Sequence, residues 1–166
     1  MQRLVVRISA VASLLGIAVW LGGLAALGAI AAPTVFSMVP PPLSADAMTV
    51  VFQRFDTVAV SCAALVLAAE AMQAIARVPF APIDHLRALL SALAAALAVT
   101  EARSVSPRIA ALHGAGAVRG VGSAGLELAK LHDTAEGLGK AQLALLVSVL
   151  ILRVFTLTRL SPPVRT

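Results

Sequence analysis

The ionisable residue most able to do chemistry inside an apolar stretch of this sequence is Glu70. Gln73 and Arg77 follow it at helical spacing, and Arg153 lies within a second apolar stretch. An ionisable group at membrane depth faces protein or water and usually has a partner. We therefore expect a Glu70–Arg153 or Glu70–Arg77 ion pair that holds two helices together, with proton or cation transfer through Glu70 as the alternative.

A second polar group has three members that recur every four residues and so share one helical stripe, namely His132, Glu136 and Lys140. Imidazole and carboxylate groups bind divalent metals, and Asp56 or Glu101 would be the third ligand of such a site. The same spacing is typical of a solvated helix start in which Glu136 pairs with Lys140. We favour that interpretation and predict no metal site.

Other kinds of chemistry find little support. His85 and His113 fall in predicted loops, outside the apolar segments where a haem ligand would be expected. The sequence holds no nucleophile elbow, HExxH motif or Walker motif. Its single cysteine, Cys62, excludes a disulfide framework and is expected to be a small packing residue. We predict a protein that is not an enzyme and that binds no cofactor.

Composition indicates the elements that must position these residues. Of the 166 residues, 60% are hydrophobic and only 13% are charged, too apolar a balance for an ordinary soluble domain. The apolar stretches predict helices over about 4–32, 45–78, 84–105 and 126–157, with a glycine-rich loop over 106–125. Pro33 is expected to end or bend the first helix. The prediction is a single all-α transmembrane domain over 1–166: an integral membrane four-helix bundle with antiparallel neighbours and both termini on one side.

The distribution of basic residues bears on partners and orientation. The net charge is +5, but the arginines fall at the ends of apolar runs, which indicates contact with lipid phosphates and not with nucleic acid. In the first half of the chain, four arginines lie on the side of the termini and one, Arg54, on the other. The positive-inside rule then predicts a bacterial inner membrane protein with both termini cytoplasmic. Lys140 is expected on the same side as Arg54.

Small residues predict where helices approach closely, because apolar character alone does not drive helix association in lipid. In the first helix the small-residue seam comprises Ala12, Gly16, Gly23 and Ala26, interrupted by Val19. The second helix offers Ala64, Ala68 and Ala71, and the third offers Ala88, Ala92 and Ala95. These seams predict tight contacts within the bundle or with another subunit.

Short motifs add a family resemblance. The run Trp20-Leu21-Gly22-Gly23, followed by Ala32-Pro33-Thr34-Val35-Phe36, resembles the transmembrane-protein-205-like family, a domain-of-unknown-function family of small four-helix membrane proteins. Leu131-His132 and Arg54, after Phe52, are similar to that family's fourth and second helix entrances. The pattern is also similar to copper-resistance membrane proteins. The resemblance implies a four-helix membrane fold and little about activity.

Two functions remain open from the sequence. The first is a non-catalytic accessory subunit of a larger membrane complex, such as a respiratory or photosynthetic assembly, packed against other subunits or against itself. The second is a small transporter or ion- or metal-handling protein that uses Glu70 and the His132–Glu136–Lys140 stripe. We favour the first, because no catalytic set is recognisable and the helices carry unpaired small-residue faces.

Overall fold

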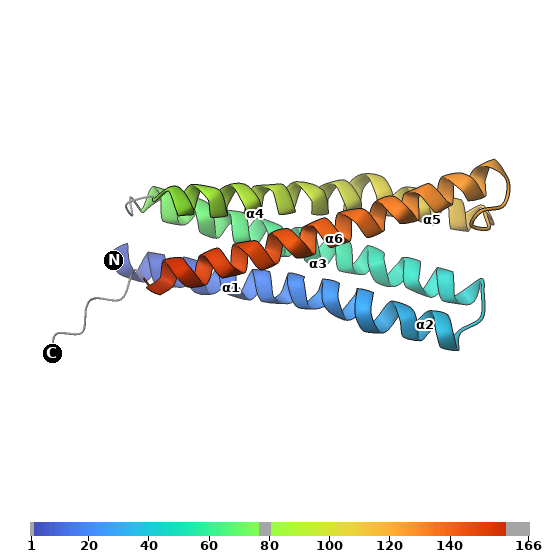
Figure 1. Ribbon diagram of the computed structural model, residues 1–166, viewed down its shortest axis with the longest axis horizontal. Helices are drawn as coiled ribbons and strands as arrows, with labels where there is room; N and C mark the ends of the chain where they lie inside the picture. The colour runs from blue at the N-terminus through green and yellow to red at the C-terminus, as the bar shows by residue number, and fades with distance from the viewer. Residues whose placement is uncertain (1, 77–80, 159–166) are drawn as a thin grey trace.

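In the computed structural model, which describes residues 2–76 and 81–158, the chain forms four long helical rods (Figure 1). The first rod joins α1 (Gln2–Ala26), the π-helical turn η1 (Leu27–Ala31) and α2 (Ala32–Met38). The second is α3 (Leu43–Ile75). The third joins α4 (Pro82–Thr100), the π-helical turn η2 (Glu101–Val105) and α5 (Ser106–Gly114), and the fourth is α6 (Gly122–Thr158).

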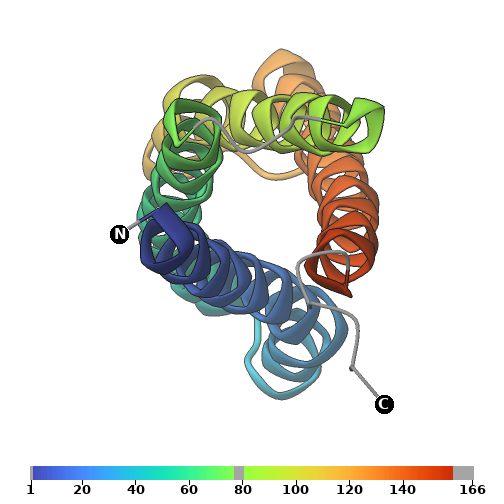
Figure 2. The ribbon, with the colours of Figure 1, turned by 90° about the vertical axis from the view of Figure 1, so that its left-hand side faces the viewer.

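The rods form a ring in which each packs against two antiparallel neighbours (Figure 2). Within the described residues α1 contacts α3 and α6, and α4 contacts the same two helices, whereas the backbones of the diagonal pairs α1–α4 and α3–α6 stay apart. The start of α1 and the end of α6 lie at one end of the bundle (Figure 1). Each rod is long and apolar enough to cross a membrane. The predicted all-α membrane bundle is therefore confirmed.

Two prolines lie inside rods, and this corrects two predicted boundaries. The first rod continues through Pro33 to Met38 and does not end near residue 32. The third continues through Pro107 to Gly114, so the predicted loop over 106–125 shrinks to 115–121. A helical proline clashes with the carbonyl four residues before it, here at Ala29 and Arg103. Both carbonyls lie in π-helical turns, whose wider i→i+5 rings give the proline room.

The connection between α5 and α6 depends on glycine at two kinds of position. Gly116 follows the end of α5 with φ of 75°, a left-handed conformation that only glycine adopts at little cost. Gly125 packs so closely on the Val118 carbonyl that a Cβ would collide with it. The segment therefore folds back tightly and brings the end of α5 beside the first turns of α6.

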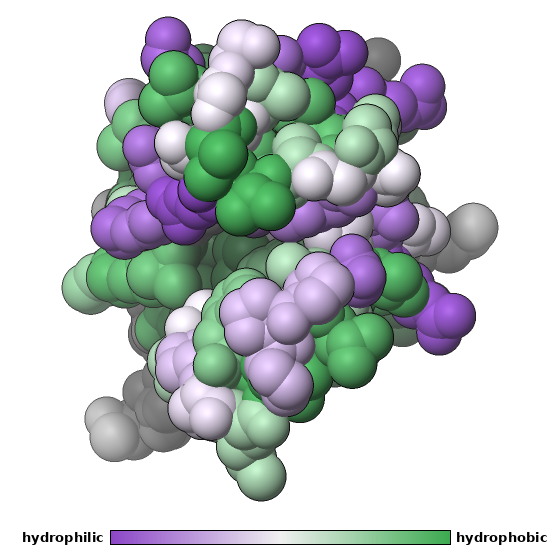
Figure 3. All heavy atoms as spheres, turned by 90° about the vertical axis from the view of Figure 1, so that its right-hand side faces the viewer, coloured by the Kyte–Doolittle hydropathy of each residue, from purple (hydrophilic) through white to green (hydrophobic). Residues whose placement is uncertain are grey.

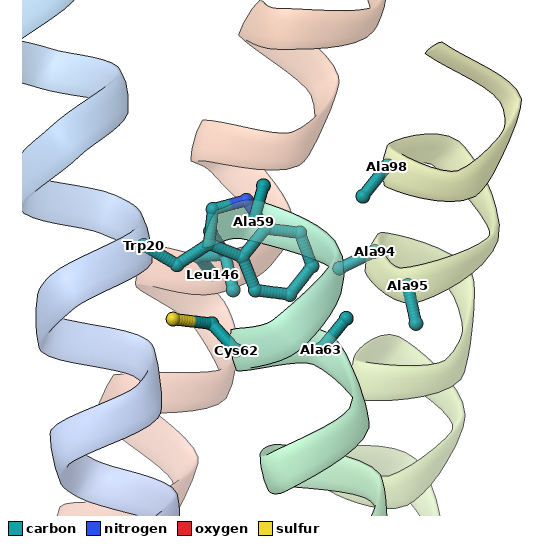
Figure 4. Packing of buried hydrophobic residues seen from close by; sticks show 8 residues of the cluster. All are labelled: Trp20, Ala59, Cys62, Ala63, Ala94, Ala95, Ala98 and Leu146. Carbon is teal, nitrogen blue, oxygen red and sulfur yellow. The ribbon is translucent and has the colours of Figure 1, made fainter. Parts of the chain in front are cut away.

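The middle of the bundle is filled by one large side chain against many small ones (Figure 4). Trp20 of α1 is only 1% exposed. It packs among small residues of α3 and α4 and one leucine of α6; these are Ala59, Cys62, Ala63, Ala94, Ala95, Ala98 and Leu146. Alanines let the backbones approach, and the indole fills the space between them. Cys62 is a packing residue, as predicted.

The predicted small-residue seams are only partly correct. Gly16 and Gly23 of α1 do face α3: a Cβ on Gly16 would lie 3.0 Å from Val66 Cγ2, and one on Gly23 would overlap the Phe55 ring. Ala12 is half-buried and Ala26 is exposed.

The seam predicted on the second helix makes no contact within the bundle, so of the two predicted kinds of contact only one with another subunit stays a prediction. Its three alanines, Ala64, Ala68 and Ala71, all point outward. The small and apolar buried residues in the middle of α3 are instead Ala59, Cys62, Ala63, Val66 and Ala69. The three alanines predicted as a seam on the third helix differ in burial: Ala95 is buried, Ala88 is half-buried and Ala92 is exposed. Both faces of these helices are rich in alanine, so residue size alone did not distinguish them.

Candidate functional site

A buried ion cluster joins three helices at the end of the bundle where α1 begins and α6 ends. Glu70 lies five residues before the end of α3, Arg87 five after the start of α4, and Arg153 five before the end of α6. At about 1.5 Å per residue, each lies about 7–8 Å from its helix end. The three side chains therefore meet at one depth.

Arg87 is the centre of this cluster. Its Nε donates to Glu70 Oε1 at 2.9 Å and its Nη2 to Glu70 Oε2 at 2.8 Å, a bidentate pair. Its Nη1 donates to Asp84 Oδ1 at 2.7 Å and to Thr156 Oγ1 at 3.0 Å. Asp84 Oδ2 in turn accepts the Ala81 N–H at 3.0 Å, which fixes the first turn of α4.

Arg153 completes the cluster from α6. Its Nη2 lies 3.3 Å from Glu70 Oε1, so the expected Glu70–Arg153 pair is present. Its Nη1 donates to Gln73 Oε1 at 2.8 Å. Arg87 is 1% exposed, Arg153 2% and Glu70 5%, so these charges are screened from the surroundings by the bundle itself.

The charges of the cluster cancel. Arg87 and Arg153 carry two positive charges, and Glu70 and Asp84 carry two negative ones. Buried charges persist only when paired, so this arrangement suits an interlock between α3, α4 and α6. Three donors of this cluster have no hydrogen-bond partner among the described residues: Arg153 Nε, Arg153 Nη2 and Gln73 Nε2.

Sequence reasoning missed Arg87 as a partner of Glu70 and counted it only as a helix-end cation. The available signal was the i, i+3 spacing of Asp84 and Arg87 at the start of a helix, together with a depth equal to that of Glu70. The other expected partner, Arg77, lies outside the described residues. Arg54 is exposed on α3.

A second polar layer crosses the bundle at the level of Trp20. The Trp20 Nε1 donates to Gln142 Oε1 at 3.2 Å, and Gln142 Nε2 donates to Glu101 Oε2 at 2.6 Å, which links α1, α6 and η2. Asp56 of α3 lies beside an open groove of about 390 Å³ between α3 and the η2–α5 segment, which Arg103 also lines. Glu101 is therefore held in this layer by Gln142, whereas Asp56 lines the groove, with its Oδ2 buried and without a hydrogen-bond partner among the described residues.

The members of the His132–Glu136–Lys140 stripe have different partners in the structure. Glu136 Oε1 accepts from Lys140 Nζ at 2.5 Å on the exposed surface of α6, as the favoured interpretation expected. His132 turns to α5, where its Nε2 lies 3.4 Å from Nε2 of His113. Within the described residues, no three or more His, Cys, Asp or Glu side chains are close enough to hold a metal.

The predicted placement of the other two histidines was also wrong. His113 lies in α5 and His85 in α4, not in loops. For His113 the reason is the same proline effect that lengthened the third rod, whereas His85 already fell within the first turn of the helix predicted over 84–105. Two further ion pairs lie on the exposed surface near His113 and His132: Arg108–Glu127 at 2.7 Å and Arg119–Asp133 at 2.9 Å.

A family model described as a domain of unknown function (DUF4149) matches residues 15–118, well over half of the chain. The chain belongs to this family. The matched segment holds Trp20, Glu70, Arg87 and Glu101, and ends before the fourth rod, which carries Arg153 and His132. No curated protein and no solved structure matches the chain. The resemblance to the transmembrane-protein-205-like family stays a prediction.

Proposed function

We propose that this protein is a non-catalytic subunit of a larger complex in a bacterial inner membrane, where its first rod packs against another membrane protein or a second copy. The observation that carries the proposal is an apolar extension, Leu27–Met38, formed by η1 and α2. It holds no charge and no buried residue. At about 1.5 Å per residue it is about 18 Å long.

The other three rods have much shorter uncharged stretches than the first rod. Their uncharged stretches cover 57–69 in α3, 88–100 in α4 and 141–152 in α6, each about 18–20 Å long. The polar layer of Trp20, Gln142 and Glu101 marks the boundary of these stretches. Beyond that layer, α5 and α6 carry their exposed ion pairs, whereas the first rod continues as the apolar extension.

At this end of the bundle one side is apolar and the other is charged, so a single depth of the hydrocarbon core cannot match both sides. Ile30 is 66% exposed, Phe36 55% and Met38 77%, at the end where α5 and α6 present charged side chains. Figure 3 views this end: hydrophilic residues gather over the half formed by α5 and α6, and the half formed by α2 and the start of α3 is mostly pale or green. A large exposed apolar surface marks an interaction site, and protein covering the extension resolves the mismatch.

The ion cluster also supports a structural role. Both oxygens of Glu70 accept hydrogen bonds from Arg87, and the total charge is zero, which suits helix clamping better than carriage of a proton or cation. Transport through Glu70 therefore has less support. The excess of arginine at the terminal end in the first half of the chain supports cytoplasmic termini.

The test is purification from native membranes in mild detergent, with a matched pair of variants. Phe36→Lys places a charge on the apolar extension, and Leu126→Lys places one on an equally exposed residue of α6, at 57% against 55%. We expect the wild type and Leu126→Lys to copurify with a stoichiometric membrane protein or as a homo-oligomer, and Phe36→Lys to be monomeric. A monomeric wild type, or equal behaviour of both variants, would contradict the proposal.

A further inference from the structure

The open groove between α3 and the η2–α5 segment has a charged and polar lining that neither the ion cluster nor the apolar extension uses. Its volume is about 390 Å³, within the range of about 300–1,000 Å³ that is typical of small-ligand sites. Most of the residues that line it are polar or charged; these are Gln53, Asp56, Thr57, Ser61, Arg103 and Ser106. The groove therefore suits a polar ligand better than a hydrocarbon chain.

The two charges that line the groove are opposite in sign and do not neutralise each other. Asp56 belongs to α3 and Arg103 to η2, the two elements between which the groove opens. Among the described residues neither side chain forms an ion pair, and Asp56 Oδ2 is buried without a hydrogen-bond partner. Glu101 is close enough to Asp56 for the two carboxylates to repel each other. The groove therefore attracts a cationic group at Asp56 and an anionic group at Arg103.

The groove lies at the level where the apolar stretches of two rods end. The uncharged stretch 57–69 of α3 begins directly after Asp56, and the uncharged stretch 88–100 of α4 ends directly before Glu101. Polar lipid headgroups lie at the edge of the hydrocarbon core. Thr57 belongs both to the groove and to the uncharged stretch of α3, so an acyl chain attached to a headgroup in the groove can lie along that stretch.

From this geometry we propose that the groove binds the headgroup of a zwitterionic phospholipid with a primary amine, of the phosphoethanolamine type. The ammonium group donates hydrogen bonds to the Asp56 carboxylate, and the Arg103 guanidinium donates to the phosphate oxygens. A quaternary ammonium has no N–H to donate to Asp56, and an anionic headgroup without an amine leaves Asp56 unpaired. The lining therefore selects a headgroup that carries both an N–H cation and a phosphate.

The experiment is native mass spectrometry of the full chain in detergent, titrated with phosphatidylethanolamine, phosphatidylcholine and phosphatidylglycerol that have the same acyl chains. We expect one phosphatidylethanolamine per chain, bound about tenfold more tightly than either other lipid, because only this headgroup makes both charge-assisted contacts. Free phosphoethanolamine carries the same charges without the acyl chains. It should not displace the lipid at equal concentration.

Two variants separate the two contacts. Asp56→Asn and Arg103→Gln should each lower the affinity for phosphatidylethanolamine about tenfold. Asp56→Asn should also abolish the preference over phosphatidylcholine, whereas Arg103→Gln should weaken the binding of both zwitterionic lipids and keep that preference. The matched control is Arg54→Gln, which removes an exposed cation two residues before Asp56 that does not line the groove. It should leave the affinity unchanged.

Four results would overturn the site. They are equal affinity for the three lipids, a lipid preference that survives Asp56→Asn, an Arg54→Gln effect as large as that of Arg103→Gln, and displacement of the lipid by free phosphoethanolamine, which would make the occupant a soluble molecule. The helical circular dichroism spectrum of each variant separates loss of the site from loss of the fold. The apolar extension is untouched by these substitutions, so this test is independent of the copurification test.

Discussion

Replacing Glu70 by glutamine changes the buried ion cluster from neutral to a net charge of +1. Glutamine fills almost the same space, but Arg87 and Arg153 are then balanced only by Asp84. Arg153 and Arg87 are 2% and 1% exposed, so neither can turn to water without opening the bundle. Breaking a buried pair by removing one partner costs about 3–5 kcal/mol. We expect Glu70→Gln to lower the free energy of unfolding by about that amount.

A second substitution, Arg153→Gln, restores the neutrality of the ion cluster. In the double variant Glu70→Gln with Arg153→Gln, the single charge of Arg87 is balanced by Asp84, so the double variant should be more stable than the sum of the two single effects predicts. Directly coupled residues show interaction energies of about 0.5–3 kcal/mol, and we expect a value near the upper end. Glu136→Gln is the matched control, because its pair with Lys140 is exposed and solvent-screened pairs of this kind contribute little to stability.

The assay is denaturant unfolding in mixed micelles, followed by the helical circular dichroism signal, for the wild type, both single variants, the double variant and the control. A Glu70→Gln effect below about 1 kcal/mol, or additive effects of Glu70→Gln and Arg153→Gln, would refute the conclusion that the bundle depends on mutual neutralisation of these charges.

Three further predictions concern packing, the polar layer and orientation. Gly23→Ala should lower the free energy of unfolding by about 1–3 kcal/mol, because the added Cβ overlaps the Phe55 ring. Gly22→Ala is the control and should not lower it, because nothing lies within 4 Å of the added Cβ. Equal effects of the two variants in thermal unfolding would contradict this packing. Trp20→Phe should cost about 1 kcal/mol or more by the same assay, because Gln142 loses the indole donor; an unchanged midpoint would argue against that hydrogen bond. A reporter that is active only in the cytoplasm should be active when fused to the C-terminus and inactive when inserted in the α5–α6 turn, and the opposite pattern would reverse the orientation.

The sequence was sufficient to predict the number of rods and their antiparallel arrangement, because four apolar stretches in 166 residues leave few alternatives. It predicted rod ends poorly where proline is accommodated. Pro33 and Pro107 each follow a π-helical turn by two residues, and nothing in the local residue types indicated those turns. The apolar extension, on which the proposed function rests, was therefore expected to lie partly in a loop.

Contacts between helices were predictable only in part. The depth of Glu70 and Arg153 could be estimated by counting residues, so their pairing was expected. Arg87 also lies at that depth, but its side chain points inward because of the rotation of α4, which pattern alone does not determine. The contact of His113 with His132 required the third rod to reach residue 114, so the shorter predicted helix concealed it.

The most direct test of the account is site-specific photocrosslinking in native membranes from Phe36 on the apolar extension, with Leu126 on α6 as the equally exposed comparison. If protein covers the extension, a photoreactive residue at position 36 should form one discrete adduct with a membrane protein or a second copy of this chain, and a residue at position 126 should not. Adducts at position 36 with lipid alone would contradict the account.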